Sequence, residues 1–456
     1  MIAPFYPELR CVQNGTQFGT IPHTNKYKER KVNTMKRSFF ILLFLLVLLV
    51  LSAQAEVEQV VIPDSPSLDL ETLAEARAAM WDNYREEMLN DETLIRETHD
   101  HAMTFGDATM RYTVEVFGEK PEEGYPLYIA MHGGGSGDTP DFNDSQWEDM
   151  QSYYTGDLEC GVYVAVRGVR DTWDTHFNPE SYPLYDRLIQ YMILTEQVDP
   201  NRVYLMGFSA GGDGVYAISA RMPDRFAAVN MSSGHPNGIS LINLFNLPIQ
   251  LQAGEFDDAY DRNRVTAEYG LKLDELQNTY GGYEHRTLIH YDSGHNYGDY
   301  QREPLDVMRD ISAWLNDGDR SHVAVDAYPP DFMDLYTRDP LPLKVIWDLS
   351  TRAELRETES FYYLSAPQST NQGVITVSAD GDNRFLVEAE AVNGEFSMLF
   401  NEYMVDFSQP VTFDVNGEET TLTLTPDMTI LMGTTLDRGD PWYQFEAMVT
   451  FKNING

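Results

Sequence analysis

The sequence predicts an α/β fold with a mostly parallel sheet covered by helices on both faces, followed by a C-terminal all-β domain of the sandwich type. Two patterns support this prediction. Between residues 106 and 320, continuous apolar runs of strand length alternate with segments of helical periodicity. From residue 325 to 456, the apolar runs are short and are separated by turn residues, without helical segments between them.

Composition limits what the chain can bind. Its 456 residues are enough for two or three domains, and 42% of them are hydrophobic. Acidic residues outnumber basic ones by 72 to 32, a net charge of −40. Such a chain repels nucleic acid and anionic membrane surfaces, so both are excluded as expected partners. We interpret the acidity as a solvated surface suited to a saline exterior rather than as a site for a basic partner.

An export signal is predicted near the N-terminus. Residues 35–55 read MKRSFFILLFLLVLLVLSAQA: two basic residues, an apolar run and small residues, with cleavage expected after Ala55. The apolar run is shorter than the ~20 residues that span a bilayer, which disfavours a stable membrane anchor. We expect translation to start at Met35, because residues 1–34 would bury the charged end of the signal. The mature chain is therefore expected to be secreted or periplasmic.

Removal of residues 1–55 takes away seven basic and two acidic residues, leaving 25 against 70, or −45. One cysteine, Cys160, remains, so no intrachain disulfide is possible, and we expect it to pack as a small hydrophobe. Residues 56–105 begin with a Pro/Ser-rich link. They continue from Ser67 to Leu89 with apolar residues at helical spacing, which predicts a helix capped by Ser67 and packed on the next domain.

Seven apolar runs between residues 106 and 320 are predicted strands. They read YTVEVFG, PLYIAMHGGG, GVYVAVRG, RVYLMGFS, FAAVNMSSG, LPIQLQAG and RTLIHYDSG, and predicted helices include LYDRLIQYMILTEQ and EPLDVMRDISAWL. In parallel sheets, ligands collect at the carboxyl ends of the strands. The glycines and histidines of this region fall at those ends.

The fourth of these runs leads into the candidate nucleophile. In RVYLMGFSAGGDGVYAISARM, Ser209 stands between a strand pattern and a helix pattern, with Gly207 and Gly211 on either side. Small neighbours permit a sharp, strained strand-to-helix turn that exposes the serine hydroxyl and leaves the amide of Ala210 free to donate. Simple capping of the helix by Ser209 is the alternative reading.

A glycine-rich loop is the candidate oxyanion site. His132 to Gly135 follow the strand PLYIAM, and an amide of Gly134 or Gly135 could face the same oxygen as the amide of Ala210. A phosphate-binding loop is the rival reading. The lysine and the Ser/Thr of such a loop are missing, and so is the G-x-G-x-x-G spacing.

The orienting acid and the base are expected after later strands. Asp257 and Asp258 follow LPIQLQAG, and Asp257 is favoured. His295 lies in the loop beyond the last strand run, where a catalytic imidazole belongs, whereas His290 is expected to pack within the strand. Ser209, Asp257 and His295 thus follow the chain order nucleophile, acid, base.

These motifs carry a family resemblance. Residues 106–320 resemble the α/β-hydrolase superfamily, and HGGGSG, GFSAGGDG and GHN look closest to secreted carboxylesterases of the polyhydroxybutyrate depolymerase-like and feruloyl-esterase-like kinds. Prolyl oligopeptidase-type serine peptidases are more distantly similar. The resemblance implies a Ser-His-Asp triad of Ser209, His295 and Asp257 with oxyanion donors among Gly134, Gly135 and Ala210. The chain departs from this family pattern because its mature form has one cysteine, whereas family members often have disulfides.

Substrate contacts are expected in the loop after GVYVAV. This loop is rich in aromatic and polar residues and supplies Arg167, Trp173, His176 and Phe177. His235 lies at the end of another strand run, near the same sheet edge. A packed surface loop is the alternative reading.

The C-terminal strands are predicted from LKVIWDL, SFYYLSA, GVITVSA, RFLVEAE, PVTFDV, TTLTLT and YQFEAMVTF, and Asn416-Gly417 predicts a hairpin turn. Their aromatic residues suit core packing better than sugar stacking. The sequence therefore predicts a secreted serine esterase that acts on a small or polymeric ester. No metal or organic cofactor is expected. A serine peptidase and an inert polysaccharide- or surface-binding protein are the alternatives.

Overall fold

The computed structural model describes residues 55–135, 140–156, 158–290, 293–296, 329–352 and 358–454. The predicted export signal up to Gln54 and the predicted helix EPLDVMRDISAWL lie outside these residues. Among the described residues, no helix is both long and apolar enough to cross a membrane. Cys160 is a free, half-buried thiol that donates a hydrogen bond to the Glu119 carbonyl oxygen at 3.2 Å.

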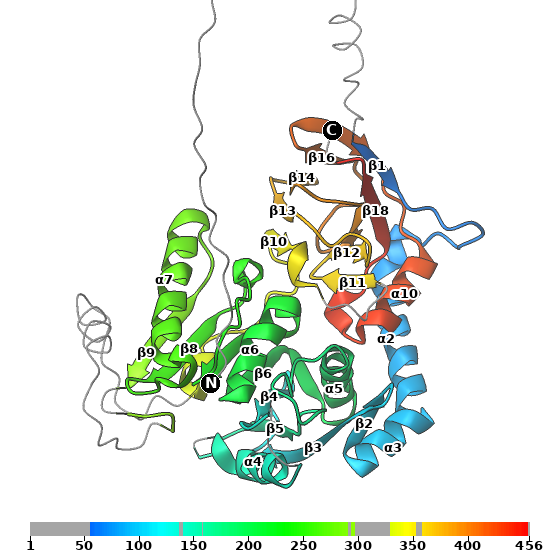
Figure 1. Ribbon diagram of the computed structural model, residues 1–456. Helices are drawn as coiled ribbons and strands as arrows, with labels where there is room; N and C mark the ends of the chain where they lie inside the picture. The colour runs from blue at the N-terminus through cyan, green and yellow to red at the C-terminus, as the bar shows by residue number, and fades with distance from the viewer. Residues whose placement is uncertain are drawn as a thin grey trace, which may run out of the picture. The chain divides into compact units, whose positions relative to one another are not determined.

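The centre of the fold is an eight-stranded sheet with the order β2-β3-β5-β4-β6-β7-β8-β9 (Figure 1). β2 and β3 pair antiparallel, β3 pairs antiparallel with β5, and all the remaining neighbours are parallel. The strands are β2 (Ala102–Phe105), β3 (Ala108–Phe117), β4 (Tyr125–Met131), β5 (Gly161–Val166), β6 (Val198–Phe208), β7 (Ala228–Ser232), β8 (Ile249–Gly254) and β9 (His285–His290). This confirms the predicted α/β class, in the topology of an α/β-hydrolase. β2, which pairs with β3, lies before the first of the predicted strand runs.

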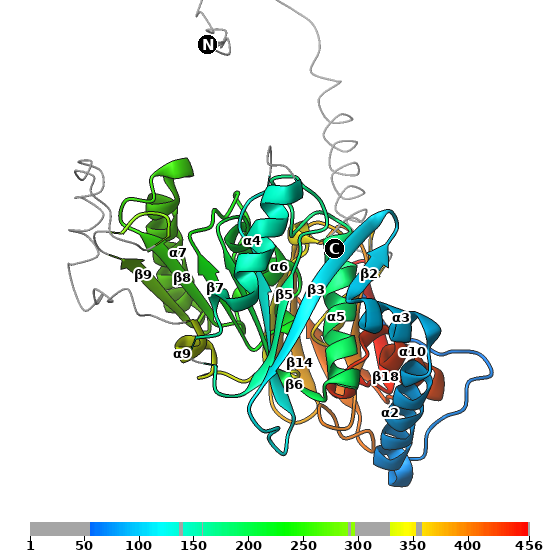
Figure 2. The same ribbon diagram turned by 90° about the horizontal axis from the view of Figure 1, so that it is seen from below.

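Helices cover both faces of this sheet (Figures 1 and 2). Along β4, Leu127, Ile129 and Met131 join the core under α5 (Ser181–Thr195), α6 (Ala210–Arg221) and α7 (Arg262–Tyr280). Tyr128 and Ala130 face the opposite side, under α4 (Pro140–Tyr153) and α9 (Pro329–Met333). Alternate strand residues point to opposite faces, and both faces are buried here. Each fully buried Val, Leu or Ile side chain contributes roughly 1.5–3 kcal/mol, which explains why these strands are continuously apolar.

The C-terminal part forms a sandwich of two five-stranded sheets, as predicted. Phe385 contacts Phe400 and Phe413 contacts Phe451, with ring centroids 5.4 and 5.5 Å apart, so the two inner faces share one aromatic core. One sheet has the order β1 (Glu56–Gln59), β18 (Ala447–Lys452), β15 (Phe396–Phe400), β12 (Leu364–Pro367), β11 (Thr358–Phe361). The other has the order β10 (Lys344–Asp348), β13 (Val374–Ala379), β14 (Arg384–Glu390), β16 (Val411–Val415), β17 (Glu418–Leu422). Asn416 and Gly417, both with positive φ, form the turn between β16 and β17.

Three details of the N-terminal segment and the sandwich were not predicted. β1, from the N-terminal segment, pairs antiparallel with β18 at the far end of the chain. A helix, α10 (Met428–Arg438), begins at Asp427, whose carboxylate accepts hydrogen bonds from the amides of Thr429 and Ile430. The N-terminal helical segment splits into α2 (Leu73–Leu89) and α3 (Glu92–Asp100), and Ser67 bridges to Asp427 instead of capping a helix.

Buried ion pairs link the eight-stranded sheet region to the sandwich. Arg338, which is 7% exposed, bonds Asp440 at 2.8 Å and donates to the carbonyl oxygen of Asp224 at 3.0 Å. Arg438 pairs with the carboxylate of Asp224 in the same region. Because a buried charge is costly without its partner, these contacts fix how the two parts pack together.

Candidate active site

Ser209 occupies the sharp turn between β6 and α6, with φ 56° and ψ −117°. A positive φ is strained for a non-glycine residue and persists only where the surroundings hold it, often at functional sites. Here the Ser209 amide donates to the Ser232 carbonyl oxygen at 2.9 Å, and the Ser209 carbonyl accepts from the Asp213 amide at 3.0 Å. The turn leaves the hydroxyl at the carboxyl edge of the sheet.

The flanking glycines are needed because backbone passes within contact distance of each. A Cβ added at Gly207 would lie 2.2 Å from the carbonyl oxygen of Gly211. One added at Gly211 would lie 2.1 Å from the carbonyl oxygen of Met131, at the end of β4. No real Cβ approaches backbone this closely, so the glycines let α6 start directly above the strands. This is the physical reason for the spacing seen in the sequence.

His295 lies between Ser209 and Asp257. Its Nε2 is 3.0 Å from Ser209 Oγ, and its Nδ1 is 2.8 Å from Asp257 Oδ2. Asp257 is almost fully buried, whereas about a third of the His295 side chain is exposed. The carboxylate can only accept from Nδ1, which leaves Nε2 as the nitrogen that faces the serine hydroxyl.

The two loops that carry Asp257 and His295 are bonded to each other. The Phe256 amide donates to the Ser293 carbonyl oxygen at 2.9 Å. A Cβ on Gly254 would lie 2.1 Å from the Gly294 carbonyl oxygen, so only glycine permits this approach. Asn263, at the start of α7, donates through its side chain to the Glu255 carbonyl oxygen at 2.9 Å and through its amide to the Asp257 carbonyl oxygen at 3.1 Å.

The alternative acid and base are placed elsewhere. Asp258 lies on the half-exposed side of its loop, and its amide donates to the Phe256 carbonyl oxygen. His290 is 1% exposed in β9 and bonds Gln252 at 2.9 Å, as expected for a histidine packed within the strand. Burial lowers the pKa of His290 to about 4.

The glycine-rich loop lies beside Ser209. Gly134 lines the same cavity as Ala210. Gly133 is closer still, since a Cβ there would lie 3.2 Å from Ser209 Cβ. The expectation for Gly135 needs correction, because its amide donates to Asn143 Oδ1 at 2.8 Å and so points away from an incoming oxyanion. Gly134 has φ 100° and Gly135 has φ 112°, values that require glycine.

A cavity of about 720 Å³ opens beside Ser209. Of the predicted substrate contacts, Trp173 and His235 line it, and Trp173 is 55% exposed. Among the described residues, no aliphatic side chain larger than alanine lines it. The remaining lining residues are Gly134, Ala210, Asp213, Asn237, Tyr260, Asp261 and Arg262.

Charge and backbone strain are concentrated at this cavity. Burial raises the pKa of Asp213, while the His235 amide and the Arg262 guanidinium act in the opposite direction. Tyr260 and Asp261 are consecutive residues with φ 58° and 57°, just before α7. This strained backbone supplies Tyr260, which is 77% exposed, and Arg262 to the cavity lining.

Arg167 and His176 do not line this cavity, contrary to the sequence prediction. Both are buried, because internal partners satisfy their polar groups. Arg167 pairs with Asp144 and Asp171, and His176 bonds the hydroxyl of Tyr185 and the carbonyl oxygen of His132. Phe177 contacts Trp173 through its ring and packs against the core.

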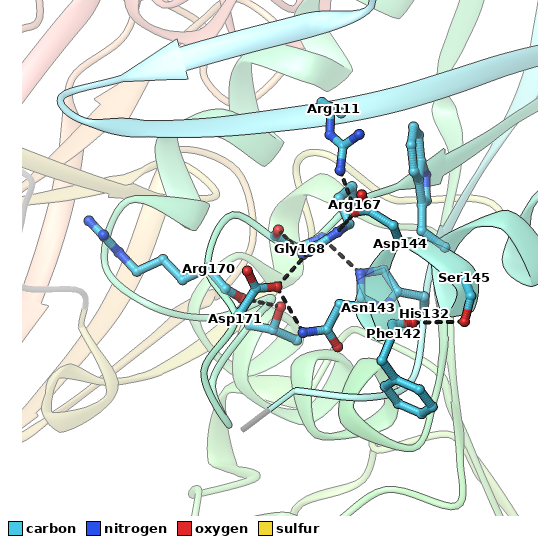
Figure 3. Close-up of polar contacts among 12 residues, drawn as sticks. Arg111, His132, Phe142, Asn143, Asp144, Ser145, Arg167, Gly168, Arg170 and Asp171 are labelled. Atoms are coloured by element: carbon cyan, nitrogen blue, oxygen red, sulfur yellow. Dashed lines mark hydrogen bonds and ion pairs between the residues drawn. The ribbon is translucent and has the colours of Figure 1, made fainter. Parts of the chain in front are cut away.

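His132 directly precedes the glycines of the glycine-rich loop, and Figure 3 shows its side chain. Its Nε2 accepts a hydrogen bond from the Gly168 amide at 3.0 Å, so the ring proton is on Nδ1 and is donated to the Gly133 carbonyl oxygen at 2.5 Å. Burial lowers the pKa of His132 to about 4, and burial also lowers the pKa of His176 well below its ordinary value. Both imidazoles are therefore neutral supports of the loop.

Sequence reasoning missed several residues of this site. Asn143 of α4 contacts the loop, and Asp171, in the segment after β5, accepts a hydrogen bond from Asn143. Nothing in their local sequence signals these contacts. Tyr260 and Arg262 depend on a left-handed backbone that the sequence does not reveal. Among the described residues, no group of three or more His, Cys, Asp or Glu side chains could hold a metal ion.

No protein-family model and no curated protein sequence matches the chain. Among solved structures, it is similar to a thermostable esterase at 19% identity and a TM-score of 0.35, over 52% of this chain and 62% of that one. The match thus spans less than two thirds of that esterase. It is also similar to a carboxylesterase from Bacillus cereus (15% identity, TM-score 0.31, 50% and 99% covered). A third is an acetyl xylan esterase from Aspergillus awamori (13% identity, TM-score 0.29, 47% and 98% covered).

Proposed function

We propose that this protein is a serine hydrolase that cleaves carboxylic esters through an acyl-enzyme. The observation that carries the proposal is the hydrogen-bonded chain from Ser209 Oγ to His295 at 3.0 Å and from His295 to Asp257 at 2.8 Å. A serine hydroxyl is a poor nucleophile unless a positioned base removes its proton. His295 is held for that task by a buried carboxylate.

The geometry supports the following sequence of steps. Ser209 Oγ attacks the ester carbonyl carbon while His295 Nε2 takes the hydroxyl proton, and Asp257 stabilises the resulting imidazolium. The amides of Gly134 and Ala210 donate to the oxyanion. Collapse of the tetrahedral intermediate expels the alcohol, which receives its proton from His295. A water molecule then repeats the attack on the acyl-enzyme and releases the acid.

The cavity supports a short or polar acyl or alcohol group. Its lining is aromatic, polar and charged, whereas long aliphatic chains need an extended apolar channel. We therefore propose that short and polar esters are turned over faster than long-chain lipid esters. Peptide amides remain the competing substrate class, and the assay below separates them from esters.

Labelling with a fluorophosphonate tests the proposal directly. We expect the wild type to be labelled and Ser209→Ala to be unlabelled, folded and reduced at least ~10³-fold in turnover of a short acyl ester. Ser145→Ala is the matched control, since its hydroxyl is exposed and bonds the local Phe142 carbonyl oxygen. Faster cleavage of aminoacyl or prolyl amides than of esters would establish a peptidase. An unlabelled wild type would favour a binding protein.

We also propose that the chain is exported. The basic pair Lys36 and Arg37, the apolar run and the small residues before Glu56 support this. N-terminal sequencing of chain recovered outside the cytoplasm is expected to begin at Glu56. A mature chain that retains residues 35–55 would overturn the proposal.

A further inference from the structure

The glycine-rich loop is bonded to Asn143 of α4, whose side chain lies beside Asp171 in Figure 3. Asn143 is fully buried, and its Oδ1 accepts the Gly135 amide at 2.8 Å. The same oxygen would lie 2.3 Å from a Cβ at Gly134, so the loop is already in close contact with it. Asn143 therefore fixes both the direction of the Gly135 amide and the position of Gly134, the residue before it.

Asp171 decides which way the Asn143 amide faces. Asn143 Nδ2 donates to Asp171 Oδ1 at 2.8 Å, and a carboxylate can only accept. Burial raises the pKa of Asp171, but hydrogen bonds from Arg167 and Asn143 outweigh it and hold the pKa below the ordinary value. The carboxylate is thus charged at neutral pH, and it turns the acceptor oxygen of Asn143 toward the loop.

Asp171 is itself held in place. Arg167, which is 5% exposed, donates through Nη2 to Asp171 Oδ1 at 2.5 Å and through Nε to Asp144 Oδ1 at 2.8 Å. Arg111 on β3 also bonds Asp144. Figure 3 shows these side chains as one continuous network. The network anchors the outer side of the loop to α4 and to the ends of β3 and β5.

The same segment anchors the inner side of the loop. Arg167 Nη1 donates to the Gly168 carbonyl oxygen at 2.8 Å, and the Gly168 amide donates to His132, which bonds Gly133. A run of three glycines has more backbone freedom than any other sequence, so its conformation must come from outside. Stabilisation of an oxyanion depends on donors that are fixed before the reaction.

We propose that Asn143, oriented by Asp171, is a positioning residue that holds the glycine-rich loop with the Gly134 amide directed at the oxyanion. This inference rests on the proposed esterase function and concerns a residue that does not touch the substrate. Loss of Asn143 acts on the transition state more than on substrate binding. It therefore lowers kcat with little change in KM.

The first experiment compares kcat and KM for a short acyl ester in Asn143→Ala, Ser145→Ala and the wild type. Removal of one oxyanion donor costs about 10²–10³-fold in kcat, and we expect Asn143→Ala to lose about 10-fold or more of kcat with KM within about threefold. The rate of fluorophosphonate labelling, which also forms an oxyanion-like state, falls in parallel. Ser145→Ala, two residues after Asn143 in α4, stays at the wild-type level.

A swap of the two side chains tests the network without removing it. Asn143→Asp alone places two carboxylates in contact, so its kcat relative to the wild type is low at pH 8 and rises as the pH falls, when a shared proton restores the hydrogen bond. In the double variant Asn143→Asp/Asp171→Asn, the carboxylate at position 143 still accepts from the Gly135 amide, and the side-chain amide at position 171 donates to that carboxylate. We expect it to recover most of the wild-type kcat and to lose the added pH dependence.

The outcomes separate this inference from the function on which it rests. A wild type that neither binds a fluorophosphonate nor cleaves esters would refute the proposed function. A labelled, active wild type with unchanged kcat per labelled serine in Asn143→Ala would refute the positioning role alone. If Asn143→Ala fails to fold, the swap variant decides, because a folded double variant no better than Asn143→Asp also refutes it.

Discussion

Replacement of Gly211 by alanine should misplace the nucleophile without unfolding the protein. The added Cβ would lie 2.1 Å from the Met131 carbonyl oxygen and 2.6 Å from its carbonyl carbon. Ordinary contact begins near 3.4 Å, so the first turn of α6 must move about 1 Å away from β4. Both atoms belong to backbone inside a buried sheet, and no side-chain rotation relieves the clash.

This shift has two expected consequences. A misplacement of about 1 Å in catalytic geometry costs on the order of 10²-fold in rate, so kcat for a short acyl ester is expected to fall about 10²-fold. Overpacking of a dense core costs about 1–3 kcal/mol of unfolding free energy. The variant therefore remains folded and loses far more activity than stability.

Steady-state kinetics and urea unfolding of the same preparation measure the two effects. Gly433→Ala is the matched control: this glycine also lies in a helix, α10, but a Cβ there meets no atom within 4 Å. We expect the control to keep its activity and to gain up to about 1 kcal/mol of stability. Wild-type kcat in a folded Gly211→Ala protein would refute the argument that close backbone approach positions Ser209.

Three further predictions follow from burial and charge. Relative to His290→Gln, the wild type loses about 3 kcal/mol of unfolding free energy as the pH falls from 6.5 to 4. Burial lowers the folded-state pKa of His290 to about 4, so the unfolded chain binds the proton first. A difference in urea unfolding that does not depend on pH would contradict this. Arg338→Met leaves the buried Asp440 carboxylate without its 2.8 Å partner and should lower the free energy of unfolding by about 3–5 kcal/mol. A decrease below about 1 kcal/mol in urea unfolding would argue against the buried pair. Trp173 is 55% exposed, so Trp173→Ala should change stability by less than about 0.5 kcal/mol. Because Trp173 lines the cavity, the variant should raise KM for esters, and an unchanged KM would exclude Trp173 from the substrate site.

Local patterns predicted much of the fold. The apolar runs that became β4 to β9 lie between helices on both faces, so their burial left a continuous signal in the sequence. The hairpin at Asn416-Gly417 was readable because positive φ restricts the residue types there. The glycines beside Ser209 were readable for the same kind of local reason.

Contacts between distant segments were not predictable. β1 pairs with β18, which lies almost 400 residues later. Nothing in the sequence of either segment identifies the strand with which it pairs. Arg167 and His176 looked like surface binding residues, yet Asp144, Asp171 and Tyr185 satisfy them in the interior. The sequence does not show whether a polar side chain forms its hydrogen bonds with water or with a buried partner.

At the candidate site, the sequence by itself determined which chemical groups are present and in what order, because strand-to-helix turns and glycine spacing are local constraints. Tertiary structure decided which groups meet. The bonded loops after β8 and β9 turn Asp257 toward His295, and Asn143 turns the Gly135 amide away from Ser209. The direction of a side chain or an amide is set by partners across the fold, and those partners come together only when the sheet is assembled.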